Sequence, residues 1–550
     1  MATAAPAAGA DCWQRTVVVA TLSRTSAAFL FLSVVVVGAV VSARYIITTT
    51  AALQGRLTRL PTTVAIPAAA VHPETQHSLP ARLSAPAPPP SRPPRPTYFI
   101  SCPTPPLRAL NLSLPAKTPQ TSQTLDRALS SSCPSSPRPL PPAASPSSNY
   151  SCPSYFRFIH EDLRPWRDAG GITRAMLDRA RLTASFRLVV LGGRAYVQRF
   201  RPAFQTRDLF TIWGVLQLLR RYPGRVPDLD LMFDCVDWPV VRAHLYRGEH
   251  AKVMPPLFRY CGDERTLDIV FPDWSFWGWP EINIKPWDAM LEDLKDANNR
   301  VRWSDRKPYA YWKGNPSVSV TRQELVRCNV SSTQDWNARI YNQDWFKESK
   351  AGYKHSGLGS QCAHRYKIYI EGSAWSISQK YILACDSMTL LVTPKYYDFF
   401  SRSLMPIQHY WPVRDDNKCG SIKYAVDWGN SHKQLAQRIG KQASNFIQEE
   451  LSMDYVYDYM LHLLTEYAKL LKFKPTKPPE AIEVCSESLA FQAEGLEKKF
   501  LVGSMVKSVH DAGSCDLPPS FGPHELKMLK QRKENSIKQI ETWEQRASRA

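Results

Sequence analysis

A carboxylate at the end of an apolar run is the strongest candidate for chemistry in this sequence. The run Leu229–Val236 predicts a buried strand, and Asp237 follows it directly, ahead of Trp238 and Pro239. In open α/β sheets, ligands bind outside the carboxyl ends of the strands. Asp237 could there act as a general base that takes a proton from an acceptor hydroxyl. The alternative is that Asp237 only caps the following turn, and Asp234, inside the strand, is expected to serve structure.

A D-x-D triplet, Asp228-Leu229-Asp230, offers a second kind of chemistry. Carboxylates so spaced can hold a divalent metal that bridges a nucleotide diphosphate. Such triplets are frequent by chance, and this one precedes the strand, at the end opposite Asp237. We therefore expect no resident metal and keep Asp228 and Asp230 as the alternative.

Two later segments have features that suit a diphosphate. Lys313 and Gly314 end an apolar run, and a lysine beside a tight turn can pair with phosphate. A second segment precedes a predicted helix, where backbone N–H groups can face phosphate; it comprises Ser373, Ala374, Trp375, Ser376, Ile377 and Ser378. The alternatives are an ordinary exposed lysine and simple serine capping. Together the features predict a phosphate cradle in the second half of the chain.

One short segment is unusually aromatic. It comprises Phe271, Pro272, Asp273, Trp274, Ser275, Phe276 and Trp277. Aromatic faces stack on sugars as well as on apolar surfaces. The alternative is hydrophobic core. The nearby Gly278 and Pro280 suggest a loop, so the density of rings predicts a binding role.

These segments need a scaffold, and apolar periodicity predicts one of alternating strands and helices. The expected strands are 186–191, 195–197, 229–236, 255–260, 267–271, 309–312, 366–370 and 389–392, and the expected helices are 172–184, 209–221, 376–385, 432–449 and 454–472. This alternation predicts an α/β fold with parallel sheets. We expect two lobes, 151–298 and 299–475, with a cleft between them. Residues 476–550 are expected to be a tail ending in a charged, solvated helix from Pro523.

The N-terminal region predicts a membrane anchor and a spacer. Residues 25–43 are uncharged, apolar and bracketed by Arg24 and Arg44. Their length approaches the roughly twenty residues that span a bilayer as a helix. We expect a signal anchor with residues 1–24 in the cytoplasm; a cleaved signal peptide is the alternative. Residues 44–150 are rich in Pro and Ser and predict a disordered stalk.

The composition of the chain indicates its partners and its cellular compartment. The net charge is +20, which favours anionic partners. The sequence has no zinc-finger spacing or RNA-recognition signature, so nucleic acid is not expected. Eleven of twelve cysteines lie beyond residue 43, and sequons occur at Asn111, Asn149 and Asn329. Both features favour a lumenal compartment where disulfides form. An odd count leaves a free thiol or an intermolecular bridge.

Several ordered blocks resemble a known family. The blocks are Cys152-Pro153-Ser154-Tyr155-Phe156, His160-Glu161-Asp162-Leu163, Gly171-Ile172-Thr173, 271–277, 309–314, the stretch from Cys362 to Cys385, and His409-Tyr410-Trp411-Pro412-Val413. Their series is similar to the Rumi-like protein O-glucosyltransferases and fungal capsule-associated proteins, glycosyltransferase family 90. The resemblance covers about residues 150–475, and the chain looks like the plant branch, whose members carry an N-terminal anchor.

The resemblance implies a GT-B fold with two Rossmann-like lobes and an inverting, metal-independent reaction. It implies UDP-glucose or UDP-xylose as co-substrate and transfer to a hydroxyl of a protein or a cell-wall glycan. Asp237 matches the family's base, segment 271–277 its acceptor loop, and segment 373–378 its donor loop. Cys362 and Cys385 match a family disulfide. The alternatives are a metal-dependent GT-A enzyme and a non-catalytic, carbohydrate-binding membrane protein.

The chain departs from the family at two donor positions. Members often carry Arg at the position of Lys313, and many carry Arg at that of Ser378. Lysine keeps the charge but lacks the bidentate fork. We expect Lys380 or Lys313 to supply the charge that Ser378 lacks. The sequence ends without a retrieval signal, which favours a single-pass type II protein of the Golgi, or endoplasmic reticulum, membrane.

Overall fold

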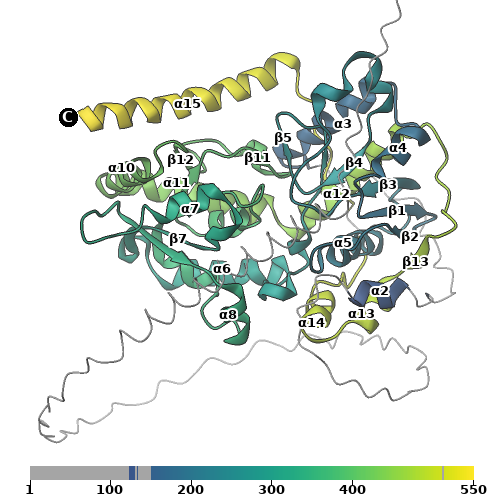
Figure 1. Cartoon of the computed structure of the whole chain (residues 1–550), viewed down its shortest axis with the longest axis horizontal. Helices are drawn as coiled ribbons and strands as arrows, with labels where there is room; N and C mark the ends of the chain where they lie inside the picture. Colours follow the sequence, from purple (N-terminus) through teal and green to yellow (C-terminus); the bar gives the residue numbers. More distant parts are fainter. Residues whose placement is uncertain (1–122, 130–132, 134–149, 511–512, 550) are drawn as a thin grey trace, which may run out of the picture. The chain divides into compact units, whose positions relative to one another are not determined.

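The computed structural model describes residues 123–129, 133, 150–510 and 513–549. The expected anchor at 25–43, most of the expected stalk, and the sequons at Asn111 and Asn149 lie outside these residues. Within the described parts, no helix combines the length and apolarity needed to cross a membrane. The described chain forms two sheets covered by helices (Figure 1), so the α/β class is confirmed.

The first sheet has six strands in the order β13-β2-β1-β3-β4-β6. Their bounds are β1 Phe186–Leu191, β2 Arg194–Arg199, β3 Leu229–Phe233, β4 Leu257–Arg259, β6 Ile269–Val270 and β13 Ile482–Val484. Strand β1 pairs antiparallel with β2 and β3, whereas β3, β4 and β6 run parallel. The expectation of a parallel sheet therefore holds for β3, β4 and β6 and is wrong for β1, β2 and β13. The Gly192-Gly193 turn is too short for the crossover that a parallel pair needs.

The second sheet is fully parallel, as predicted, in the order β12-β10-β9-β7-β8. Its strands are β7 Lys307–Gly314, β8 Ala338–Asn342, β9 His364–Tyr369, β10 Met388–Val392 and β12 Trp411–Val413. Two further short strands, β5 Gly262–Asp263 and β11 Tyr396–Tyr397, pair with each other across the two halves of the chain. Parallel order brings the carboxyl ends of β7, β9 and β10 to one edge of the sheet.

Helices cover both sheets. They are α2 Gln123–Leu129, α3 Phe158–Asp168, α4 Arg174–Ala180, α5 Arg207–Arg221, α6 Trp287–Arg300, α7 Val320–Val326, α8 Trp345–Lys350, α9 Ser378–Leu383, α10 Lys418–Ser431, α11 Lys433–Asn445, α12 Met453–Leu470, α13 Ser486–Gln492, α14 Gly495–Gly503 and α15 Pro523–Arg549. All five predicted helices exist, with shifted ends. Thr173 caps α4 as expected, because its hydroxyl accepts the Met176 N–H at 3.2 Å.

The last hundred residues are integrated into the fold. The Tyr467 hydroxyl of α12 donates to the Asp230 carbonyl of β3 at 3.0 Å, and β13 extends the first sheet. The expected solvated tail is therefore wrong in part. In α15, Lys530 pairs with Glu264 at 2.9 Å, and Glu544 accepts from Ser421 of α10 at 2.5 Å. The helix thus contacts both halves of the molecule (Figure 1).

Candidate active site

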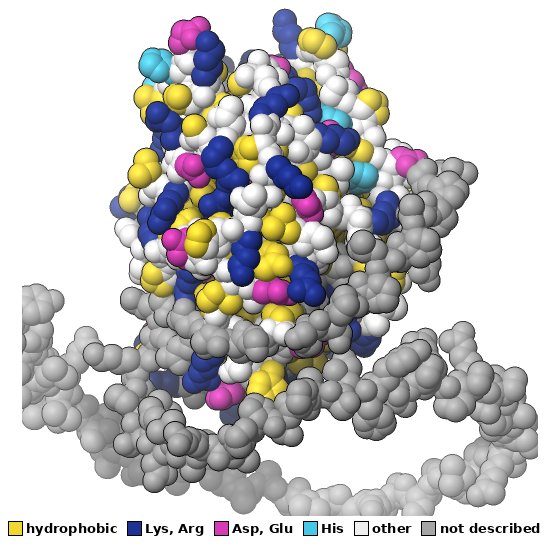
Figure 2. Space-filling view, turned by 90° about the vertical axis from the view of Figure 1, so that its right-hand side faces the viewer, with side chains coloured by type: hydrophobic (Ala, Val, Ile, Leu, Met, Phe, Trp, Pro, Cys, Tyr) yellow, Lys and Arg dark blue, Asp and Glu magenta, His cyan; other side chains and the backbone are white. Residues whose placement is uncertain are grey.

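A cavity of about 830 Å³ lies between the two sheets. Five cationic side chains and two carboxylates line it: Arg201, Arg207, Lys313, Arg322 and Lys367, with Asp237 and Glu281. This excess of positive charge suits an anionic ligand. By contrast, Lys and Arg on one outer face are scattered rather than gathered (Figure 2). The charge that matters for a ligand is therefore that of the cavity.

Asp237 lies in this cavity, beyond the carboxyl end of β3. Its Oδ1 accepts a hydrogen bond from Arg207 Nη1 at 2.6 Å, and its side chain remains 27% exposed. Arg207, at the start of α5, is buried and stacks on Trp274, 4.4 Å from the ring centre. The guanidinium therefore fixes one carboxylate oxygen and leaves the side chain open to the cavity.

The backbone on both sides of Asp237 is held by one buried arginine. Arg259, whose side chain is 2% exposed, donates from Nη1 to the carbonyl of Val236 at 3.1 Å and to that of Trp238. Arg259 was not singled out in the sequence. Its position in β4, parallel to β3, places its side chain beneath the loop that carries Asp237.

Two buried carboxylates compensate Arg259. Asp234 accepts from Arg259 Nη2, and Asp268 lies 3.2 Å from Arg259 Nε. Asp268 also accepts the N–H groups of Val240 and Val241. Burial nevertheless raises the pKa of Asp268 to about 6. Asp234 therefore pairs with a buried arginine, which is the structural role expected for it.

The opposite wall carries a cation that the sequence did not reveal. Arg322 of α7 donates to the carbonyls of Asn315, Ile370 and Glu371 and, at 3.2 Å, to Ser376 Oγ. All these acceptors are uncharged. Burial lowers the Arg322 pKa to about 10, so the group stays cationic at neutral pH. No periodic pattern marked α7, a helix of seven residues.

Most of the expected donor residues lie beside Arg322. Those that line the cavity are Lys313, Gly314, Ser373, Trp375, Ser376, Ile377 and Ser378, whereas Ala374 is buried. Ser376 Oγ links Arg322 to Ser378, whose hydroxyl lies 2.9 Å away. The Lys313 ammonium donates to the His355 carbonyl at 2.6 Å. A Cβ at Gly314 would approach the Trp312 ring to 2.6 Å, so only glycine fits there.

Lys380 does not reach the cavity. Its side chain is 1% exposed, and its ammonium binds Asp273 Oδ2 at 2.9 Å and Ser275 Oγ at 2.8 Å. Burial lowers its pKa, and Asp273 opposes that shift. The expectation that Lys380 supplies charge to a donor is therefore not met, because α9 directs it to the first half of the chain.

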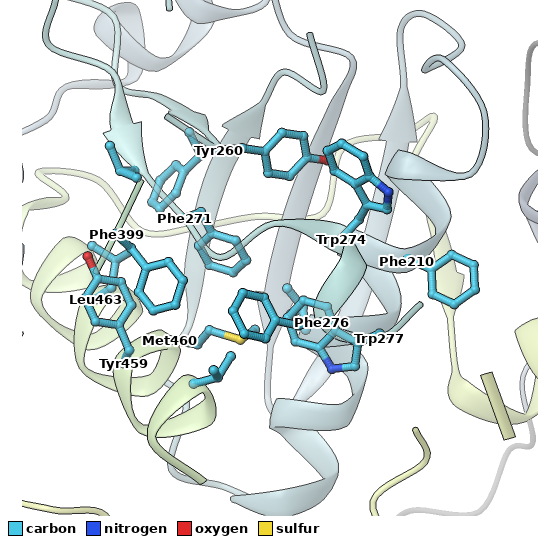
Figure 3. Packing of buried hydrophobic residues seen from close by; sticks show 14 of the residues in the cluster. Phe210, Tyr260, Phe271, Trp274, Phe276, Trp277, Phe399, Tyr459, Met460 and Leu463 are labelled. Carbon is cyan, nitrogen blue, oxygen red and sulfur yellow. The ribbon is translucent and has the colours of Figure 1, made fainter. Parts of the chain in front are cut away.

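The aromatic segment 271–277 is mainly core. Phe271, Phe276 and Trp277 are buried, together with residues of α5 and α12 (Figure 3). Within the segment only Trp274 lines the cavity. The high ring density therefore reflects packing rather than an open binding loop.

Two indole N–H groups in the cavity wall lack an acceptor among the described residues. They belong to Trp274 and Trp375, whose ring centres lie 6.3 Å apart. A buried donor without an acceptor costs about 1–3 kcal/mol.

The family is decided by comparison with known proteins. The model of glycosyl transferase family 90 matches residues 147–544. The chain belongs to this family. The match includes β13 and most of α15, so the C-terminal segments are part of the family 90 unit.

Curated relatives agree with this assignment. The O-glucosyltransferase rumi homolog of Aedes aegypti is 27% identical over 354 residues, 62% of this chain and 84% of that protein. Protein O-glucosyltransferase 1 of Homo sapiens is 27% identical over 350 residues, 60% of this chain and 84% of that protein. O-glucosyltransferase rumi of Drosophila melanogaster is 24% identical over 357 residues, which are 62% of this chain and 82% of that protein. The chain is a Rumi-like glycosyltransferase.

The D-x-D triplet of this family 90 glycosyltransferase lies away from the cavity. Asp230 is fully buried and accepts from Arg187 at 2.7 and 2.6 Å and from Arg174 at 2.6 Å. Asp228 accepts the Gly192 N–H at 2.8 Å. Two guanidinium groups already pair with Asp230, so this carboxylate stabilises the fold and is not free to bind a metal-bound diphosphate.

Cys362 and Cys385 are joined by a disulfide, the pair that the resemblance implied. Two further disulfides link Cys152 to Cys515 and Cys328 to Cys419. The Cys152 bond ties the start of the family 90 unit to its C-terminal part. The Cys328 bond fastens the end of α7, the helix of Arg322, to α10.

Asn329 is expected to carry no glycan in the folded family 90 protein. Its side-chain amide donates to the Ile340 carbonyl at 3.2 Å and accepts the Ile340 N–H at 3.0 Å. An attached sugar would crowd this pairing beside β8. Mass spectrometry of tryptic peptides after peptide-N-glycosidase treatment in heavy-oxygen water, which marks each formerly glycosylated asparagine as aspartate, would measure occupancy. Full occupancy of Asn329 would contradict the expectation.

Glu281 is expected to make the stability of the protein pH-dependent. Burial raises its pKa to about 7, against hydrogen bonds such as that from Thr206. Between pH 4.5 and 7 the folded state then binds more protons than the unfolded state, so stability falls as pH rises. Relative to wild type, Glu281→Gln should gain about 1–3 kcal/mol across this window.

Chemical denaturation at pH 5 and pH 7.5 would measure this difference. Glu249→Gln is the control. The Glu249 side chain is 86% exposed, so its surroundings differ little between the folded and unfolded states and its replacement should not alter how stability depends on pH. Parallel stability curves for wild type and Glu281→Gln would contradict the assignment.

Proposed function

We propose that this protein transfers glucose or xylose from a UDP-sugar to an acceptor hydroxyl, with inversion at the anomeric carbon. The observation that carries the proposal is the cavity itself, which is lined both by the Asp237 carboxylate and by the Arg322 guanidinium, whose acceptors among the described residues are all uncharged. The paired sheets suit a GT-B arrangement, in which one lobe holds the acceptor and the other the donor.

Asp237 is the proposed general base. It removes the proton of the acceptor hydroxyl while the oxygen attacks the anomeric carbon, and UDP leaves from the opposite face. The Arg207 bond holds Asp237 Oδ1, so the carboxylate has a fixed direction. Developing charge on the diphosphate is stabilised by cations that need no reorganisation, namely Arg322 and Lys313.

Glu281 is a second carboxylate in the same cavity. Its raised pKa places its titration near neutral pH, a property of catalytic bases. Asp237 remains the proposed base, because Arg207 and Arg259 fix both its side chain and its backbone. Glu281→Gln should therefore retain turnover where Asp237→Asn does not.

Arg322→Gln is expected to weaken UDP binding by about 10- to 100-fold, because a charge-assisted hydrogen bond is worth about 1.5–3 kcal/mol. Arg322→Lys keeps the charge and should recover part of this loss. Isothermal titration with UDP would measure both, alongside the melting temperature. An unchanged Kd for Arg322→Gln would remove Arg322 from the donor site.

The acceptor is proposed to be a serine or threonine hydroxyl of a protein, since the relatives' names describe protein O-glucosyltransferases; a cell-wall glycan is the alternative. Incubating the purified protein with UDP-glucose, UDP-xylose and other UDP-sugars would identify the donor from UDP release. UDP binding without release from any of them would favour a carbohydrate-binding protein instead.

The proposed location is the Golgi or endoplasmic reticulum membrane, with residues 25–43 as the anchor and the catalytic unit in the lumen. Support comes from the sequence of that segment and from the three disulfides. Protease protection of the catalytic unit in intact microsomes tests this topology. Cleavage without detergent would reject it.

A further inference from the structure

Residues 123–129 dock on the C-terminal part of the protein. Helix α2 packs against α13, with Leu125 and Ala128 fully buried. The Thr124 hydroxyl donates to Glu497, and Arg127 lies 3.5 Å from Glu494. Residues 123–129, expected to be part of a disordered stalk, therefore belong to the folded unit.

Two half-buried cysteines meet where this segment reaches the first sheet. Cys133 Sγ lies 3.6 Å from the Glu483 carbonyl of edge strand β13. Cys485 stands two residues beyond Glu483, at the end of β13, so its thiol and that of Cys133 meet at the same edge of the sheet and each perturbs the pKa of the other. The nearby Cys133 thiol is the main reason why the Cys485 pKa is lowered to about 6. A thiolate at neutral pH is the form that attacks disulfides.

We propose that Cys133 and Cys485 form a disulfide that fastens the segment preceding the catalytic unit to the edge of the first sheet. The Cys485 thiolate attacks a small-molecule or protein disulfide oxidant and forms a mixed disulfide. Deprotonated Cys133 then attacks Cys485 Sγ and displaces the oxidant's second thiolate. Two electrons and two protons pass from the two thiols to the oxidant, which leaves as a dithiol or two thiols.

This bond would be a second link between the N-terminal and C-terminal portions of the chain, in addition to the Cys152–Cys515 bond inside the family 90 unit. It would also brace α13, which holds α5. Gln217 of α5 donates to Ser486 at 3.1 Å, and Arg220 pairs with Glu487 at 3.1 Å. Because α5 begins with Arg207, the cross-link supports the helix that fixes Asp237. The inference concerns covalent structure and holds whatever sugar is transferred.

Peptide mass spectrometry of the full-length protein from a secretory host tests the proposal. The protein is blocked with N-ethylmaleimide without reduction and digested. We expect a peptide pair linking Cys133 to Cys485 that disappears on reduction. The three disulfides already described serve as positive controls, and the buried thiols Cys235 and Cys261, labelled only after denaturation, as negative controls.

Variants give an independent readout. Cys133→Ser should expose Cys485 to maleimide, and Cys485→Ser should expose Cys133. Each single variant and the double variant should lower the melting temperature by the same amount, because all three remove one bond. Maleimide on both residues of the unreduced wild-type protein would overturn the proposal. So would either residue cross-linked elsewhere, or thermal losses that add in the double variant.

Discussion

Asp237→Asn is expected to lower kcat for sugar transfer by about 10²- to 10⁴-fold, the usual contribution of a positioned general base. Asparagine keeps an oxygen that can accept the Arg207 hydrogen bond but cannot take up a proton. The melting temperature and the Kd for UDP should therefore stay close to those of wild type. Initial rates of UDP release, with calorimetry and UDP titration, measure all three quantities.

Asp228→Asn is the matched control for this experiment. Asp228 lies nine residues upstream and outside the cavity, where it accepts the Gly192 N–H. Asparagine retains that acceptor, so turnover should not change. Near-normal turnover of Asp237→Asn would reject Asp237 as the base. Loss of turnover in Asp228→Asn would instead support the D-x-D triplet as a metal site.

Arg259→Met is expected to lower the free energy of unfolding by about 3–5 kcal/mol, the usual cost of breaking a buried ion pair from one side. Asp234 and Asp268, both buried, would lose their compensating cation. The carbonyls of Val236 and Trp238 would lose their donor. Urea denaturation measures the stability, and kinetics at a temperature where the variant is folded measure the activity.

Arg259→Lys separates the two roles of this residue. Lysine restores a charge between the carboxylates but cannot reach both carbonyls with a planar fork. It should therefore recover much of the stability while kcat stays reduced at unchanged donor affinity. Arg302→Met is the control, because the Arg302 side chain is 85% exposed and solvent screens its pair with Asp305, so the stability should change little. Wild-type kcat in Arg259→Lys would make Arg259 purely structural.

The sequence predicted the features that depend on local patterns. The apolar runs around Phe186 and Leu229 form strands, as predicted. Such strands can be recognised because the spacing of apolar residues along a short segment indicates which side chains are buried. Asp237 was predicted to lie at a ligand site because a carboxylate after a buried strand lies at a sheet edge, and it lines the cavity. The ordered blocks from Cys152 onward identified the family through residue order alone, which family matching confirmed.

Other predictions failed where local pattern is ambiguous. Phe276 and Trp277 have the composition of a sugar-binding surface, yet they pack in the core, since the same rings serve either use. Lys380 was expected in the donor site, but α9 turns it toward Asp273. A side chain's direction depends on how its helix packs, and no short segment specifies that.

The residues alone were enough to predict the family and the α/β class, which are confirmed, and to single out Asp237 as the candidate base. The cations that line its cavity or hold its backbone became identifiable only from the three-dimensional packing. Arg207, Arg259 and Arg322 stand in three different elements, and nothing in their neighbours marks them. Their roles arise because the carboxyl ends of β3, β7 and β9 converge on one cavity, while β4 places Arg259 beneath the loop after β3. Convergence of distant segments follows from sheet order and packing, which no local spacing encodes.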